Sequence, residues 1–294
     1  MYYSDDPGAM DNNTNSGFKA RGRWCEASRT FELMGTVHTD LGFQEKLLLN
    51  HMDIKLTLYR NSDNFCLITG DGGNLDYKIQ VVNMSWFVRK VKLLSTLALG
   101  LEAQLQREVA RYAVRRLVMK TVHVDSGRME LSDTLIFSGQ IPRRLLLACV
   151  GSEAYHGSMT TNPFNFEPHA ITQIQITAGG VTYPRNPMRL DFVNDRYTRA
   201  YISLFETLNI VGDDKSNSID YEAYKKGFTV FGIDLSPDMS DGGHWELIRE
   251  GSTYLKINFG AVTPASGIKI IVLGELDNLL MIDAYRNTMF DFTL

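Results

Sequence analysis

The chain has 294 residues, and its 30 lysines and arginines stand against 34 aspartates and glutamates, a formal net charge of −4. Hydrophobic residues make up 44% and charged residues 22%, which excludes a fully disordered chain, a collagen and a coiled-coil rod. This length suggests about two domains and can bury enough surface to fold without disulfides. The net charge lacks the basic excess typical of proteins that bind nucleic acid or anionic lipid.

The cysteines and the N-terminus bear on the cellular compartment. Cys25, Cys66 and Cys149 are far apart and form no zinc-binding spacing, which indicates free thiols in a reducing environment. Residues 1–17 are polar and acidic, and we predict that they are disordered and are not a targeting peptide. No apolar run approaches the ~18 residues that a membrane span needs. We expect a soluble protein of the cytoplasm or nucleus, neither secreted nor membrane-bound.

β-Type patterns dominate the first half of the chain. Alternating apolar and polar residues predict strands over 31–38, 54–59, 77–93 and 112–124. Leucines recur at three- and four-residue spacing between 93 and 111, which predicts a helix there. Turn-forming residues gather at 70–76 and at 125–128.

The second half continues in the same manner after a boundary that we place between residues 130 and 140. Strands are predicted over 144–150, 171–176, 181–183, 228–233, 253–259 and 268–273. Gly179 and Gly180 predict a hairpin turn, and residues 196–208 have helical spacing. Many short strands with few helices predict a mainly β protein, a sandwich or barrel with Greek-key connections.

The sequence lacks the common catalytic signatures. Neither a GxGxxG or GxxxxGK[ST] nucleotide loop nor a GxSxG elbow occurs, and no two of the six histidines are two residues apart. Other Ser/His/Asp arrangements stay open, because a triad is defined by geometry. His38 and Asp40 could supply two metal ligands, or simply end a strand. The loop 213–222 partly resembles a calcium loop, but it has Ile219 and Lys225 where the central Gly and closing Glu belong.

A group of basic residues is a second open possibility. Arg107, Arg111, Arg115, Arg116 and Lys120 could form a positive face for nucleic acid or an acidic partner, or could be a solvated rim. With the acidic net charge, they give no strong nucleic-acid signal. We expect no cofactor and no metal site.

Several ordered motifs point to a known family. They are FSGQIPRRL at 137–145, NPFNF at 162–166, RAY at 199–201, GFTVFGIDLSPD at 227–238, HWELI at 244–248 and GELDN at 274–278, with FQEKLLLN at 43–50 and FVRKV at 87–91 upstream. Over roughly residues 16–284 the chain resembles an uncharacterised family of animal genomes, first catalogued as a hypothetical nematode protein. Many copies look like genes of integrated viruses or of Polinton-type (Maverick) transposons. The family's plan is similar to that of double-jelly-roll major capsid proteins.

This resemblance implies a fold and a division of the chain. We expect a mainly β, jelly-roll β-sandwich: a complete C-terminal jelly roll over 133–294, the later strands of a preceding one over 18–132, and one or two short inserted helices. Members usually have a longer N-terminal part, so the resemblance also implies an N-terminally truncated copy. The function implied is that of a non-enzymatic capsid-like subunit. Its partners would be copies of itself, in trimers, and other capsid proteins, with the virion as a further location.

Within that family plan, the motif residues become candidates for structural or assembly roles. Phe164 and Phe166 are expected to cover the barrel end and the loop asparagines to cap turns. The segment from Asp234 to Asp238 should end a strand, and Glu275 with its neighbours should form a polar corner. The full candidate set is Asn162, Pro163, Phe164, Asn165, Phe166, Asp234, Pro237, Asp238, His244, Trp245, Glu275, Asp277 and Asn278. The alternative function is a host-adopted, lectin-like or protein-interaction β-sandwich, and an enzyme on a β-barrel comes third.

Overall fold

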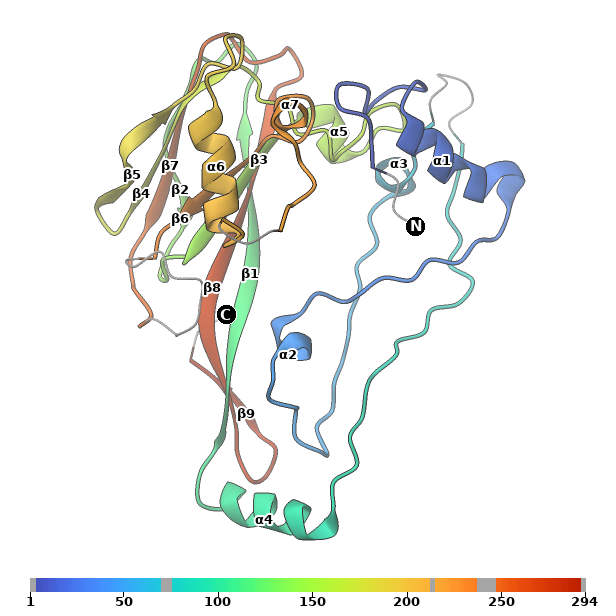
Figure 1. The fold of residues 1–294 in the computed structure, drawn as a ribbon, viewed down its shortest axis with the longest axis vertical. Helices are drawn as coiled ribbons and strands as arrows, with labels where there is room; N and C mark the ends of the chain where they lie inside the picture. The colour runs from blue at the N-terminus through green and yellow to red at the C-terminus, as the bar shows by residue number, and fades with distance from the viewer. Residues whose placement is uncertain (1–3, 70–75, 212–214, 237–246, 292–294) are drawn as a thin grey trace. The chain divides into compact units, whose positions relative to one another are not determined.

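The computed structural model describes residues 4–69, 76–211, 215–236 and 247–291. The chain divides into two compact units, each built from separate stretches of sequence. The first unit comprises Met1–Met34, Asn61–Tyr77 and Leu117–Leu276, and the second comprises Gly35–Arg60, Lys78–Arg116 and Asp277–Leu294. Figure 1 shows the course of the chain.

Nine strands of the described residues form two sheets, and eight of them make up the main fold. One sheet has the order β1-β8-β3-β6, with the short β9 paired to β8, and the other has the order β2-β7-β4-β5. The strands are β1 (Ala110–Val124), β2 (Glu130–Phe137), β3 (Arg144–Gly151), β4 (Ile171–Ala178), β5 (Val181–Arg189), β6 (Val230–Asp234), β7 (Thr253–Phe259), β8 (Ile268–Ile282) and β9 (Thr288–Phe290).

The order of pairing identifies the topology. Strand β1 neighbours β8, β2 neighbours β7, β3 neighbours β6 and β4 neighbours β5, as in one long ribbon folded on itself. The ribbon is then wound, because β3 also pairs with β8 and β4 also pairs with β7. Eight strands wound into two sheets in this way are a jelly roll. The expectation of a mainly β jelly-roll sandwich is confirmed by this pairing.

The core lies between the two sheets. Leu145 and Leu147 of β3 belong to the same buried cluster as Ile174 of β4 and Leu255 and Ile257 of β7. In β4 and β7 these residues alternate with less buried positions, so each of these strands contributes one face to the interior, whereas residues 147–150 of β3 are all buried. The side chain of Ile176 is fully buried, as is that of Leu255.

Three short helices are inserted among the described strands, where one or two were expected. They are α5 (Ser152–His156), α6 (Thr198–Thr207) and α7 (Tyr221–Tyr224). An aromatic cluster holds the last two to the sandwich: Tyr197 stacks on Tyr221 with ring centroids 4.3 Å apart, and the Tyr224 hydroxyl donates to the carbonyl of Val230. Helix α6 lies along β6 (Figure 1).

The first jelly-roll strand begins at Ala110, upstream of the division that the sequence predicted at residue 133. Strand β1 pairs with β8 and β2 pairs with β7, so β1 and the first residues of β2, which precede residue 133, belong to the same fold. The sequence pattern predicted β1 but gave no signal for β2. Two irregularities in its register with β7 break the alternation of β2.

The strands predicted over 31–38, 54–59 and 77–93 are not formed. The structure assigns no strand over residues 29–39, 51–62 or 76–94, which run as extended chain between α1 (Ser16–Cys25), a 3₁₀ turn (Glu26–Ser28), α2 (Asp40–Phe43), α3 (Asp63–Cys66) and α4 (Ser95–Leu105). The alternating pattern is present, but a strand is completed only by hydrogen bonds to a neighbouring strand. The predicted turn at 70–76 lies almost wholly outside the described residues.

The second unit has a small cluster of its own. Tyr112, Leu280 and Ile282 are buried there against Leu48, Leu49 and other partly buried residues. The Tyr112 hydroxyl donates to the carbonyl of Leu47 at 3.1 Å, and burial raises the pKa of this phenol. No described helix in either unit is both long and apolar enough to cross a membrane.

Candidate assembly and docking site

The NPFNF loop at 162–166 follows α5 and precedes β4. Asn162 is buried, and its side-chain oxygen accepts a hydrogen bond from the backbone N–H of Phe164 at 2.9 Å, so this asparagine caps a turn as predicted. Phe164 forms edge-to-face contacts with Phe65 and Phe166, at centroid distances of 6.2 and 6.3 Å. Phe164 is nevertheless 61% exposed, and neither phenylalanine belongs to the core cluster, so they do not close the barrel end as expected.

The same loop is held to the chain's first residues. The Asp11 carboxylate accepts the backbone N–H of Asn162 at 2.5 Å and the side-chain amide of Asn165 at 2.7 Å. Residues 4–15 are therefore placed by specific contacts, although the sequence predicted a disordered segment. The acidic side chains that suggested disorder serve as hydrogen-bond acceptors. The signal that could have revealed this is Asn15, which precedes the first helix and caps it by accepting from Phe18 N–H.

Asp234 ends β6, as predicted. Its carboxylate accepts from the backbone N–H and the hydroxyl of Ser236, at 2.8 and 2.5 Å. Register places Arg144 of β3 opposite Asp234 on one side and Glu275 of β8 on the other. Opposite charges therefore alternate across three strands, which favours this register. Pro237, Asp238, His244 and Trp245 lie outside the described residues.

The expected polar corner at Glu275, Asp277 and Asn278 is wrong, because all three lie inside β8. Asp277 and Asn278 are buried and meet two arginines of the neighbouring strand β1. Arg115 Nε lies 3.4 Å from the Asp277 carboxylate, and Arg116 Nε donates to the side-chain oxygen of Asn278. Buried polar side chains that have such partners can continue a strand, where a polar run alone predicts a turn.

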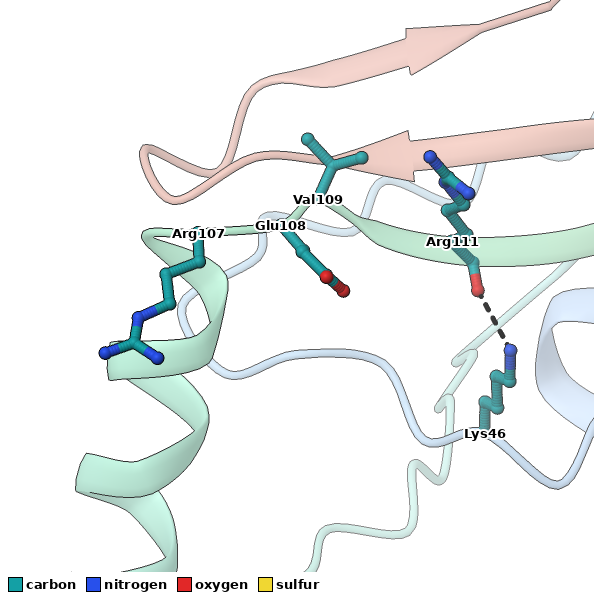
Figure 2. A pocket seen from close by; sticks show the side chains of 5 residues that line it. All are labelled: Lys46, Arg107, Glu108, Val109 and Arg111. Carbon is teal, nitrogen blue, oxygen red and sulfur yellow. Dashed lines mark hydrogen bonds between the residues drawn. The ribbon is translucent and has the colours of Figure 1, made fainter.

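These pairings also change the interpretation of the basic group. Arg115 and Arg116 face the second unit's own acidic and amide side chains. A hollow of about 530 Å³ is lined by Lys46, Arg107, Glu108, Val109 and Arg111. Figure 2 shows that the guanidinium groups of Arg107 and Arg111 point away from each other, while Lys46 donates to the carbonyl of Arg111. The cations do not converge on one point, as an anion site requires.

A Ser/His/Asp contact is present among the residues that the structure describes. His123 lies between Ser152 and Asp125, with its ring nitrogens 3.3 Å from the serine hydroxyl and 3.4 Å from the carboxylate. The Ser152 side chain is enclosed and its backbone N–H donates to Gly267, so that amide is not available to an oxyanion. Within the described ranges, no three His, Cys, Asp or Glu residues gather as a metal-binding group. Asp213 and Asp214, of the calcium-like loop, lie outside those ranges.

Burial shifts several titratable groups without bringing them together in one site. It raises the pKa of the Cys149 thiol to about 12, so this core cysteine is an unreactive thiol at neutral pH. It raises the pKa of Tyr197 and Tyr224 in the aromatic cluster. It lowers the pKa of His169, which favours the neutral form of this imidazole in the folded protein.

Comparison with known proteins identifies a relative. No family model matches the chain. An uncharacterized protein of Caenorhabditis elegans is 34% identical over 281 residues, which is 95% of this chain and 66% of the nematode protein. The two proteins are homologous. The match confirms the resemblance to the animal-genome family of the hypothetical nematode type. The chain spans just under two thirds of this relative's length.

Solved structures of viral capsids are similar to the chain, with TM-scores of 0.40 or less. The Sputnik virophage structure has a TM-score of 0.40 with 13% identity, covering 63% of this chain and 39% of that one. The PBCV-1 virus capsid gives 0.34 with 9% identity over 64% and 52%, and the mavirus major capsid protein gives 0.33 with 10% identity over 63% and 42%. The jelly-roll topology rests on the strand pairing of this chain and is independent of these likenesses.

Proposed function

We propose that the chain is a non-enzymatic, capsid-like structural subunit of a virus-derived or Polinton-type element, and that it assembles with copies of itself into trimers. The jelly-roll topology supports this proposal. Jelly rolls occur in viral capsids, lectins and cupins, so the fold narrows the choice without deciding it. The choice among these functions therefore depends on the parts of the chain that lie outside the jelly roll.

The observation that carries the proposal is the exposed apolar surface of the extended segments 29–39, 51–62 and 76–94. Leu33 is 84% exposed, Tyr59 92% and Phe87 82%. Soluble monomers rarely leave so many large apolar side chains in water, and large apolar patches mark interaction sites. Extended chain with strand-type alternation is suited to pairing with further strands. We propose that these segments are strands of a second barrel, completed when partner strands are supplied.

Self-association follows from the same surface. A patch that must be covered, repeated on identical subunits, favours closed symmetric oligomers, and three copies would bring their jelly rolls into one block. The assembled protein would be found in the cytoplasm or nucleus, or in a virion if the element is active. A lectin-like β-sandwich would instead bind a glycan ligand.

Mass photometry of the purified chain tests this proposal, with glycan-array binding as the competing readout. We expect trimers, and we expect Phe87→Asp to reduce the trimer fraction without lowering the melting temperature. Leu56→Asp repeats this test in another extended segment, at a position that is less exposed than Phe87. A monodisperse monomer at micromolar concentration contradicts the proposal, and saturable glycan binding by that monomer supports the alternative.

A further inference from the structure

Asn162, Asn165 and Gly227 of the jelly-roll unit contact the segment that precedes α1, and we refer to the surface formed by these three residues as the notch. The backbone N–H of Gly8 donates to the carbonyl of Lys226 at 2.9 Å, directly after α7. Asp11 accepts from Asn162 and Asn165, as described above. The segment Asp5–Asp11 is thereby held at two places, one directly after α7 and one at the NPFNF loop.

The floor of this notch is Gly227. Its φ of +105° suits glycine, and a Cβ there would overlap the Met10 sulfur and lie 2.8 Å from the side-chain oxygen of Asn165. The Met10 side chain is 4% exposed. A methionine therefore fills the space that the missing side chain of Gly227 leaves, and its flexible thioether suits an irregular cavity.

The bound segment has a fold of its own. Asn15 is fully buried, and its side-chain oxygen accepts from the backbone N–H groups of Asp6 and Phe18 at 3.2 Å each. Its side-chain amide donates to Asp5, which also bonds to Arg21. These contacts join residues 5–15 to α1. The Asp5 carboxylate also accepts a hydrogen bond from the side-chain amide of Asn162 at 3.5 Å, but α1 itself is held through the segment, so the segment and its helix can move as one piece.

The connection that follows allows such movement. After the 3₁₀ turn, residues 29–39 are extended and exposed, and no strand is assigned to them. Eleven extended residues span up to about 36–40 Å. An element joined to the rest of its chain by an exposed linker can exchange between identical subunits at low cost, because the contacts within and between chains are the same.

We propose that Gly227, Asn162 and Asn165 form a docking notch for the Asp5–Asp11 segment, and that in the assembled protein this notch takes the segment from a second copy. The notch selects a short acidic peptide with one methionine: two loop amides donate to Asp11, and the glycine floor receives Met10. The exchange between copies rests on the self-association proposed above, whereas recognition of the peptide does not.

A labelled peptide of residues 4–16 tests the recognition. It is titrated by fluorescence anisotropy into the full chain with Met10→Asp, in which the chain's own segment no longer fills the notch. We expect saturable binding at least tenfold tighter than to the unmodified chain, whose own segment competes. Adding Gly227→Ala should weaken this binding at least tenfold. Gly127→Ala is the matched control, because Gly127 also has a positive φ (+74°) but a Cβ there would meet nothing within 4 Å.

Asp11→Ala is a milder opening variant if Met10→Asp does not fold, as judged by its melting transition. If the peptide binds neither the Met10→Asp chain nor the Asp11→Ala chain, the proposed recognition is wrong. It is also wrong if a peptide with Met10→Asp binds as tightly as the unmodified peptide.

Cross-linking tests the exchange between copies, in a chain with Cys25→Ser and Cys66→Ser because both thiols are exposed. A Met10→Cys chain is mixed with an Asn165→Cys chain and oxidised, and a chain with both substitutions reports the contact within one copy. We expect cross-linked dimers from the mixture. A cross-link in the double variant without dimers in the mixture overturns the exchange. Peptide binding by a strictly monomeric protein would contradict the proposed function while leaving the notch intact.

Discussion

The jelly roll and the extended segments 29–94 have the same alternating patterns but opposite outcomes. In β4 and β7, alternate residues such as Ile176, Leu255 and Ile257 are buried between two sheets. In the extended segments, Leu33 and Phe87 stand at equally apolar positions and remain in water. Alternation fixes which side chains share a face, but only a neighbouring strand turns that face into a core.

The comparison predicts a large contrast between two leucines. Leu147→Ala removes a side chain that is 1% exposed in the centre of β3, and we expect it to lower the free energy of unfolding by about 2–5 kcal/mol. Leu33→Ala, at a position 84% exposed, should change it by less than about 0.5 kcal/mol. Urea denaturation of both variants measures this. Equal losses would mean that residues 29–39 are packed in solution.

A smaller effect is expected where the jelly-roll unit meets the segment around α3. Replacing both Phe164 and Phe166 by alanine removes two edge-to-face contacts, each contributing about 0.5–1.5 kcal/mol. The melting temperature should fall by several degrees. Phe205→Ala on α6 removes one edge-to-face contact, with Tyr201, away from the NPFNF loop, and its melting temperature is the reference with which the double variant is compared. An unchanged melt in the double variant would remove any packing role for the NPFNF loop.

The smallest effect concerns pH. Burial lowers the folded-state pKa of His169 below its ordinary value of 6.5. The unfolded chain therefore binds the proton more tightly, and this stabilising contribution is complete above pH 6.5 and is lost as pH falls through the folded pKa. His169→Asn, which tolerates the positive φ of this residue, should flatten the decline in melting temperature between pH 7.5 and 5.5. A slope unaltered by His169→Asn would show that other groups set the pH dependence.

Local pattern predicted the elements whose partners are also regular. The strand at 253–259 and the helix at 196–208 correspond closely to β7 and α6, and the hairpin at Gly179 and Gly180 joins β4 to β5. Strand β8 was predicted only to residue 273. Its continuation contains Asp277 and Asn278, whose arginine partners are over 150 residues away in sequence.

Tertiary contacts also explain what the sequence did not reveal of the candidate site. The asparagine cap at Asn162 follows from local turn chemistry and was predictable. The contact between Met10 and Gly227 was not predictable, because the two residues are more than 200 positions apart in the sequence. The contact also depends on Gly227 having no side chain. The pattern of residues 29–94 predicted strands for a similar reason, since nothing local in a sequence reports whether a strand has a neighbour.

Native-state amide hydrogen exchange tests the central claim most directly, because protection reports hydrogen bonding residue by residue. In the unassembled chain we predict strong protection across β3, β4, β7 and β8, and exchange near the unfolded rate over 29–39, 51–62 and 76–94. In assembled material the same three segments should become protected. Protection of those segments in the monomer equal to that of the jelly roll, or no change on assembly, would contradict the account.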